Sequence, residues 1–441
     1  WNLVCNDYWK IPLQHICFMS GWIMGYILLG TLSDCLSCLL GLPVCLSNSA
    51  VIFLLLRLLQ GSTLAGVFVS SYITRLELCD PLHRLMASMV GGFFSIFAEV
   101  CLPGVAALCR DWPVLQAVAT LPLLQLLSCW CCASMFPESP RWLLATNQMS
   151  LAKRSLQDVT VRNGVCLQDD MYPGETLLAQ IDSAPEERQP KFFTVLELRR
   201  TRVIWKNCLI LSFTLFIGTG IQYCFTRNLH TYSTNFYFAY FVRVITGALA
   251  CVFICLSVNR YGRRGMLLLS AIVTGLSSLL LLALTQCTSV PSGLLARGSG
   301  PEFVTCCACL CVTDLYGAMV LVLSVVGLLF SQALAMLSVF FASEVMPTVL
   351  RGGCLGLVLA AGCVGMAASS LMELQNNSGY FPQVIFASFA VLSVLCILLL
   401  PESKRKSLPD SVAEGENQRR PPLFSARPHR DSLPLLYTTT P

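Results

Sequence analysis

The sequence is poor in charge. Only 12% of its 441 residues are Asp, Glu, Lys or Arg, whereas 55% are hydrophobic. A soluble domain usually carries about 25% charged residues, so this chain has too few ionic side chains to cover a water-facing globule. This deficit excludes the set of soluble domains that its length alone would suggest.

The chain also shows no arrangement of residues that would support enzyme chemistry. Its histidines, at positions 15, 83, 230 and 429, are scattered, and no phosphate-binding loop or Ser/His/Asp set follows a predicted strand. Most of the 24 cysteines lie inside apolar stretches, where Cys behaves as a small hydrophobic residue. We therefore expect neither an enzyme nor a bound metal or cofactor.

The net charge of +5 comes from Lys and Arg residues that lie between apolar stretches rather than on one element. A nucleic-acid-binding surface would gather these residues, so their distribution excludes nucleic acid as a partner. Cations between apolar stretches are instead typical of the cytosolic loops of membrane proteins.

Apolar stretches near 20 residues long fill most of the chain. Such a stretch crosses a hydrocarbon core about 30 Å thick at a rise of about 1.5 Å per residue. The sequence therefore predicts an all-α membrane protein with about eleven transmembrane helices in a lipid bilayer. The expected spans are residues 11–32, 36–50, 52–74, 85–108, 114–136, 207–225, 236–258, 266–286, 318–341, 355–372 and 381–400.

A polar break divides the expected helices into a group of five and a group of six. We expect an N-terminal bundle over residues 11–136, a central loop over 137–206 and a C-terminal bundle over 207–400. Lys and Arg collect on one side of this arrangement, so the central loop and the C-terminus are expected to be cytosolic. The tail, residues 401–441, bears Pro, Arg and Glu and is expected to be disordered.

Short motifs stand at the expected ends of the helices. A turn between two helices needs Gly, and cations there complement the negative end of the first helix. Residues 259–264 read N-R-Y-G-R-R and offer both. The residues expected to set topology or conformational change are Asp34, Arg57, Gly61, Glu138, Arg141, Arg260, Gly262, Arg263, Arg264, Glu344 and Arg351.

Together these motifs resemble those of the solute carrier 22 family, the organic anion and cation transporters of the major facilitator superfamily. Residues 137–143 read P-E-S-P-R-W-L, and residues 344–351 read E-x-x-P-T-x-x-R. The resemblance covers nearly the whole chain. It implies two six-helix bundles around a central cavity that opens alternately to the two sides of the membrane, in a multi-pass protein of the plasma membrane.

The start of the chain extends the resemblance. Residues 1–5 read W-N-L-V-C and look like the W-D-L-V-C that closes the large extracellular domain of the family. Residues 1–10 are therefore expected to be a remnant of that domain, and the resemblance implies that the first helix of the fold is missing.

The turn at Asp34, between the first two expected spans, departs from the family pattern. Family members usually carry D-R-x-G-R-R there, whereas Asp34 is followed by Cys-Leu-Ser-Cys with no cation. This loss is expected to shift the conformational balance or to abolish cycling. A transporter-like receptor or scaffold is therefore the alternative to a carrier of small organic ions, for which anions are slightly favoured.

Two charged residues are expected inside the membrane, where an Arg costs about 2.5–3.5 kcal/mol. Arg243 either contacts an anionic substrate, pairs with Glu99 or reaches the headgroups. Glu99 either couples proton movement to transport or pairs with Arg57 or Arg243. The sequence leaves these alternatives open, and for Arg57 itself it favours a role in packing and at a hinge, with Gly61.

Uncharged residues are further candidates for a substrate cavity, although such residues more often hold helices together. They are Gln222, Tyr223 and Gln332, together with the aromatic residues Phe94 and Phe97.

Two signals concern the surface. Asn376-Asn377-Ser378 matches a glycosylation sequon on the expected outer face, but so close to the membrane that modification is not expected. Asp431 precedes Leu435 and Leu436 at the spacing of a dileucine sorting signal, which makes sorting machinery a candidate partner.

Overall fold

The computed structural model describes the chain in ten ranges. Every regular element within them is helical, so the predicted all-α class is confirmed. The described residues are 10–28, 49–79, 83–123, 139–162, 201–232, 235–288, 302–375, 381–403, 408–409 and 411–417.

Within these ranges, seven helices are long and apolar enough to cross a membrane. In lipid every backbone N–H and C=O must be satisfied internally, and the helix does this at each turn. The seven are α3 (Ala50–Leu78), α4 (Arg84–Leu108), α10 (Arg202–Tyr232), α11 (Phe236–Tyr261), α12 (Arg263–Thr288), α13 (Glu302–Val345) and α14 (Thr348–Gln375).

Two shorter apolar helices, α1 (Lys10–Leu28) and α15 (Phe381–Ile397), correspond to the first and last expected spans. The expected span 36–50 lies almost wholly outside the described residues. The expected span 114–136 is described only as far as α5 (Trp112–Thr120) and the short 3₁₀ helix η2 (Leu121–Leu123). The count of about eleven helices therefore stays a prediction.

The first bundle contains α1, α3, α4 and α5, and its tightest packing joins α1 to α3. A Cβ atom on Gly25 would lie 2.0 Å from the Ser62 carbonyl oxygen, and one on Gly61 would lie 2.6 Å from the Phe18 carbonyl oxygen. Only glycine allows two backbones to approach so closely. The expected packing role of Gly61 is supported by this contact.

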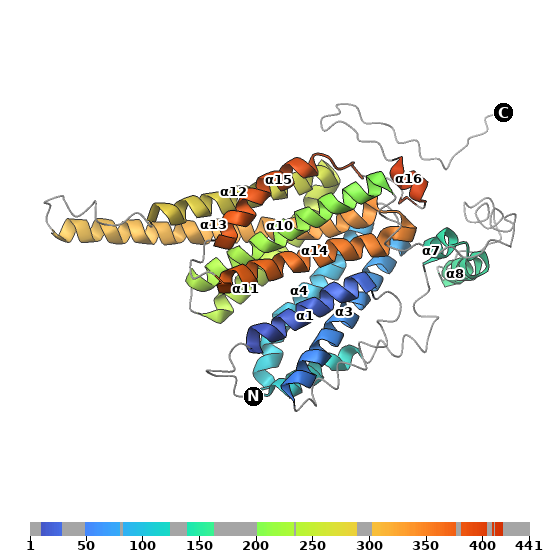
Figure 1. Ribbon diagram of the computed structural model, residues 1–441, viewed down its shortest axis with the longest axis horizontal. Helices are drawn as coiled ribbons and strands as arrows, with labels where there is room; N and C mark the ends of the chain where they lie inside the picture. The colour runs from blue at the N-terminus through green and yellow to red at the C-terminus, as the bar shows by residue number, and fades with distance from the viewer. Residues whose placement is uncertain are drawn as a thin grey trace.

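The second bundle contains α10 to α15, with α10 at its centre against α13, α14 and α15. Its core belongs to an apolar cluster that extends into α3 and α4 and includes Leu211, Leu337, Phe340 and Leu355, all fully buried. α10 is accordingly the most buried of the seven spans. The lower group of helices in Figure 1 is the first bundle, and the group above it is the second.

The two bundles meet along α1 and α14 and along α4 and α11. A Cβ atom on Gly356 of α14 would lie 2.1 Å from the Tyr26 carbonyl oxygen of α1. On the other side of the junction the Cys251 thiol of α11 lies 3.6 Å from the Met89 carbonyl oxygen of α4. The bundles are thus in direct contact along these two pairs of helices, and α3 also contacts α14.

Three short helices lie at one end of the molecule, on the right of Figure 1: α7 (Pro140–Ala145), α8 (Met149–Arg162) and α16 (Val412–Glu416). The same end carries Arg84, Arg263, Arg264 and Arg351, and we call it the basic end. α7 and α8 lie within the expected central loop. α7 begins at Pro140 after Ser139, whose hydroxyl accepts a 3.3 Å hydrogen bond from the Trp142 amide.

The expected disorder of the tail is wrong for its first part. The Glu416 carboxylate of α16 accepts hydrogen bonds of 2.9 and 3.0 Å from the Val203 and Ile204 amides. These amides belong to the first turn of α10, where N–H groups have no partner within the helix and attract a negative charge. Composition predicts disorder here because it does not register this long-range cap. Residues 418–441 lie outside the described residues.

Several helices run past the expected span ends. α3 continues to Leu78 rather than ending at residue 74, and α10 begins at Arg202 rather than at residue 207. The physical reason is that a hydropathy window stops at the first charged residue, whereas helical hydrogen bonding continues until a cap or a turn interrupts it. As a result, charged residues that lie just beyond an expected span can belong to a helix rather than to a turn.

Candidate functional site

A cavity of about 370 Å³ lies between the two bundles. α1, α3 and α4 of the first bundle and α10, α13 and α14 of the second all contribute to its wall. Its lining is mostly apolar, and Arg75 and Glu99 are the charged residues among the described ones that line it. Apolar walls with a few placed polar groups are the usual form of a small-molecule site.

The wall on α3 is held in place by Tyr72, which is buried. Its hydroxyl lies 3.0 Å from the Ser88 hydroxyl of α4, and its ring stacks on Phe68 at a centroid distance of 6.1 Å. The Arg75 guanidinium lies over the same ring, 5.8 Å from its centroid. Tyr72 therefore joins α3 to α4, and its ring packs against the Arg75 guanidinium.

Arg75 is half-buried and sits close to α4. Its Nε donates a 3.1 Å hydrogen bond to the Ser71 carbonyl oxygen one turn earlier. A Cβ atom on Gly91 would lie 1.8 Å from Arg75 Nη1, so the guanidinium occupies the space that a side chain at position 91 would take. In the described part of the chain no carboxylate lies within 4 Å of Arg75.

Glu99, the other charged residue of the lining, is paired. Arg243 Nη2 of α11 donates a 2.9 Å hydrogen bond to Glu99 Oε2 of α4, and the Tyr240 hydroxyl donates one of 2.7 Å to the Glu99 carbonyl oxygen. Gln332 Nε2 of α13 donates a 3.0 Å bond to the Arg243 carbonyl oxygen. This ion pair joins the bundles about 22 Å along α4 from Arg84, far from the basic end.

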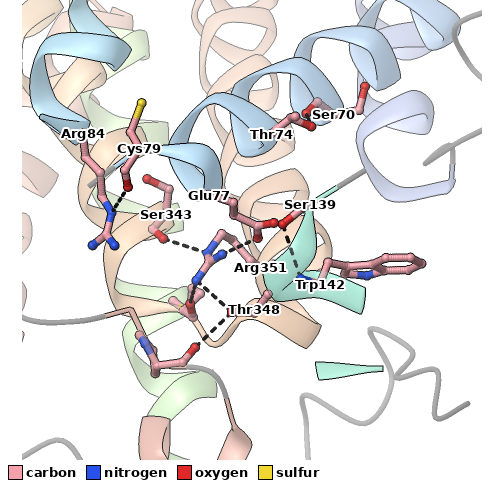
Figure 2. A network of polar contacts seen from close by, with 12 residues as sticks. Ser70, Thr74, Glu77, Cys79, Arg84, Ser139, Trp142, Ser343, Thr348 and Arg351 are labelled. Carbon is pink, nitrogen blue, oxygen red and sulfur yellow. Dashed lines mark hydrogen bonds and ion pairs between the residues drawn. The ribbon is translucent and has the colours of Figure 1, made fainter. Parts of the chain in front are cut away.

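At the basic end a second ion pair joins the bundles. Arg351 of α14 pairs with Glu77 of α3 (Figure 2). Both side chains are almost completely buried. The same guanidinium donates to the carbonyl oxygens of Ser343 and Met346, at 3.0 and 3.2 Å, and to the Thr348 hydroxyl at 3.3 Å. A buried charge is stable only with such a full set of partners.

A third ion pair lies within the second bundle at the same end. Arg263 Nε and Nη2 donate to the two oxygens of Glu344 at 3.1 and 3.3 Å, which is the two-point geometry that guanidinium and carboxylate favour. Glu344 also accepts a 2.7 Å hydrogen bond from the Ser403 hydroxyl. The pair therefore ties α12 and α13 to the residues that follow α15.

Gly262 and Glu402 complete this corner. Gly262 has φ +88° and ψ 161°, a backbone conformation that is essentially restricted to glycine. The Glu402 carboxylate accepts hydrogen bonds of 3.0 and 3.1 Å from the amides of Arg263 and Arg264, at the start of α12. Arg264 also donates to the Leu398 carbonyl oxygen. The expected turn motif is thus a capped junction between α11 and α12.

The other residues predicted as candidates lie elsewhere. Gln222 and Tyr223 are half-buried on α10, outside the lining of this cavity. Gln332 is buried and joins α13 to α11 through the Arg243 backbone, which is the packing alternative. Phe94 and Phe97 of α4 are exposed and are not among the described residues that line this cavity.

Arg57 lies between aromatic rings rather than beside a carboxylate. Its guanidinium is 5.4 Å from the ring centroid of Phe18 and 5.5 Å from that of Phe53, and its Nη1 donates a 3.4 Å bond to Gln60. The pairing of Glu99 with Arg57 is therefore excluded in this structure, and the pairing with Arg243 is present.

The remaining predicted residues lie in helices at the basic end or outside the described residues. Arg141 lies in α7 and Arg260 in the last turn of α11. Outside the described residues are Asp34, Glu138, Asn376, Asp431, Leu435 and Leu436.

Arg75 and Glu77 were not among the predicted residues. The expected span ends at residue 74, so both lie outside it. A signal was nevertheless present, because R-L-E directly follows an apolar helix that carries polar residues at Ser70 and Thr74. A helix that faces water or protein on one side tolerates such charges.

The comparisons with known proteins agree with this geometry. Residues 16–411 match the family described as sugar (and other) transporters. Human solute carrier family 22 member 23 is 36% identical over 99% of this chain, which spans 64% of that relative's length. Human solute carrier family 22 member 17 is 36% identical over the whole chain and 69% of its own length.

A solved structure shows the same fold. The proton:xylose symporter XylE of the major facilitator superfamily, bound to 6-bromo-6-deoxy-D-glucose, superposes with a TM-score of 0.63 at 17% identity. The match covers 90% of this chain and 86% of the symporter chain. At this identity the likeness concerns the fold alone.

Proposed function

Because the chain belongs to the solute carrier 22 family of the major facilitator superfamily, we propose that it carries small organic ions across the membrane by alternating access and favours anions. The observation that carries this proposal is the cavity between two bundles, which ion pairs between described residues join near both ends.

Alternating access requires each end of the cavity to open while the other stays closed. The Glu77–Arg351 pair joins the bundles at the basic end, and the Glu99–Arg243 pair joins them at the opposite end. Opening either end separates one pair and lets water reach its charges, which lowers the cost of the separation. Each pair thus supports the closed state of its own end.

The charges of the cavity favour an anion. The negative charge of Glu99 is neutralised by Arg243, whereas Arg75 has no carboxylate within 4 Å in the described ranges. A cation would meet an uncompensated guanidinium in a mostly apolar space, where like charges repel more strongly than in water. The uptake of anions should therefore exceed that of cations.

The proposal is tested by uptake into liposomes that contain the purified full-length protein. Matched sets of organic anions, organic cations and neutral solutes are offered to wild-type liposomes and to empty ones. We expect uptake of at least some anions, above that of cations of similar size. A null result across all three sets, from protein shown to be correctly inserted, would overturn the proposal.

A transporter-like receptor or scaffold is the second candidate. The observation that favours it is the first-half turn, in which Asp34 is followed by Cys-Leu-Ser-Cys instead of the cations usual in the family. A protein with this role would reach the cell surface, keep the fold and leave every solute outside. The uptake experiment, combined with surface labelling, separates the two candidates.

A further inference from the structure

We infer that Arg75, seated beside Gly91, is the group that binds the negatively charged end of an amphiphilic organic anion in the cavity. We call the space beside Gly91, which the guanidinium occupies, the Gly91 notch. The inference rests on the proposed function and adds to it the residue that selects the charge and the orientation in which the anion lies.

The first argument is the unused hydrogen-bonding capacity of Arg75. A guanidinium has five N–H donors, and the Nε donor is used by the Ser71 carbonyl oxygen. The residue lines the cavity, and no carboxylate of the described chain lies within 4 Å of it. The two terminal nitrogens can therefore form the paired hydrogen bonds that a carboxylate or sulfonate accepts.

The second argument is that the guanidinium is held in position before any ligand arrives. It lies over the Tyr72 ring, which is itself fixed by Ser88 and Phe68. On its other side it fills the Gly91 notch. Binding then costs little side-chain entropy, which leaves more of the interaction energy for affinity.

The third argument is the chemistry of the remaining wall. Beyond Arg75 the cavity is bordered by Ile96 of α4, by Met336 and Val339 of α13 and by Leu359 and Met366 of α14. These side chains suit an apolar ring or chain, and flexible Met side chains adapt to bodies of different shape. One charged end and one apolar body together define an amphiphilic anion.

Arg243 is a less suitable group for this role. It is already paired with Glu99, and it is not among the described residues that line the cavity. An anion that bound Arg243 would have to displace the Glu99 carboxylate and leave it unpaired. Arg75 offers the same charge without that cost.

The test measures binding rather than transport. The purified full-length protein in lipid nanodiscs is titrated against fluorescein, an anion, and rhodamine 123, a cation with the same xanthene ring system, and fluorescence anisotropy reports binding. We expect wild type to bind fluorescein more tightly. Arg75→Gln should weaken fluorescein binding about tenfold or more, and Arg75→Lys less, because it keeps the charge but loses the two-point geometry.

A control for the loss of charge is Arg110→Gln. It removes a cation from an exposed residue beyond the end of α4 and should leave fluorescein binding unchanged.

A second test variant, Gly91→Ala, has its own control. Gly91→Ala keeps Arg75 but fills the notch, which should weaken fluorescein binding several-fold. Gly104→Ala, on the same helix, places a methyl group in open space among the described residues and should have no effect. Thermal unfolding of each variant checks that it is folded.

The outcomes separate this inference from the proposed function. Wild type that binds neither dye, or Arg75→Gln that binds fluorescein like wild type, overturns the inference. If Arg75→Gln does not fold, the comparison of Gly91→Ala with Gly104→Ala decides, and equal fluorescein affinity of the two overturns it. Fluorescein binding that depends on Arg75, without uptake of any solute, supports the inference and overturns the proposed carrier.

Discussion

Glu77 and Arg351 lie 274 positions apart in the sequence and form a buried ion pair between the two bundles. Each comes from the end of a helix that borders the cavity, α3 in the first bundle and α14 in the second. Since the pair is almost inaccessible to solvent, its charges depend on each other. The loss of either partner alone would therefore leave an uncompensated buried charge.

Removing one partner of the pair should lower the free energy of unfolding more than removing both. Glu77→Gln leaves the Arg351 charge buried and should lower stability by about 3–5 kcal/mol, whereas Glu77→Gln combined with Arg351→Met should recover much of the loss. Thermal unfolding of the two single variants and the double variant, in the same detergent, gives the coupling energy. Additive losses would show that the residues do not act as a pair.

Gly262 should tolerate no side chain. Its φ of +88° is unfavourable for any residue with a Cβ atom, and that atom would lie 3.0 Å from Glu402 Oε2. We expect Gly262→Ala to cost about 1–3 kcal/mol. Gly265→Ala, three positions later, places its methyl group in open space among the described residues and is the matched control. Equal unfolding midpoints for the two variants would contradict the assignment.

Glu416 should stabilise the start of α10 from the tail. Glu416→Ala removes the acceptor for the Val203 and Ile204 amides and should cost about 0.5–2 kcal/mol, the range for loss of a helix cap. Glu414→Gln, at an exposed position of the same short helix, should have a smaller effect. Hydrogen exchange at the first turn of α10 measures the difference, and unchanged protection in Glu416→Ala would refute the docked tail.

Arg243 and Glu99 should behave as one unit in transport. Arg243→Gln and Glu99→Gln each break the pair that joins α4 to α11, so both should change the uptake rate in the same direction. The exchanged variant, Arg243→Glu with Glu99→Arg, should restore part of the wild-type rate. The coupling energy should be about 1 kcal/mol or less, because both side chains are partly exposed. Loss of fluorescein binding in Arg243→Gln but not in Glu99→Gln would instead indicate direct contact with the substrate.

The orientation in the membrane gives a further prediction. Lys and Arg gather at the basic end and in the tail, so the C-terminus should be cytosolic and the protein should reach the plasma membrane. An epitope fused to the C-terminus should stain only after cells are permeabilised. Staining of intact cells would contradict this orientation.

The dileucine pattern in the tail should act as a sorting signal. Replacement of Leu435 and Leu436 by Ala should therefore raise the amount of protein at the cell surface.

The helix boundaries show which features can be predicted from local sequence and which cannot. The sequence predicts that α11 starts at residue 236, and it does. Asn235 caps the helix, because its side-chain oxygen accepts a 3.1 Å hydrogen bond from the Tyr237 amide. The end of α3 was placed too early, because a hydropathy window treats Arg75 and Glu77 as a boundary. Both charges are accommodated by contacts with other helices, which no local window contains.

The sequence by itself determined that this chain is an all-α membrane protein, and its motifs identified the family. Hydrophobicity, helix length and turn chemistry are local properties, so they can be read from the sequence. The tertiary structure decided which charges meet: Arg243 with Glu99, Arg351 with Glu77, and Glu416 with the start of α10. It also left Arg75 lining the cavity with no carboxylate of the described residues within 4 Å. These pairings depend on distances between residues remote in the sequence, which only the packing of the helices sets.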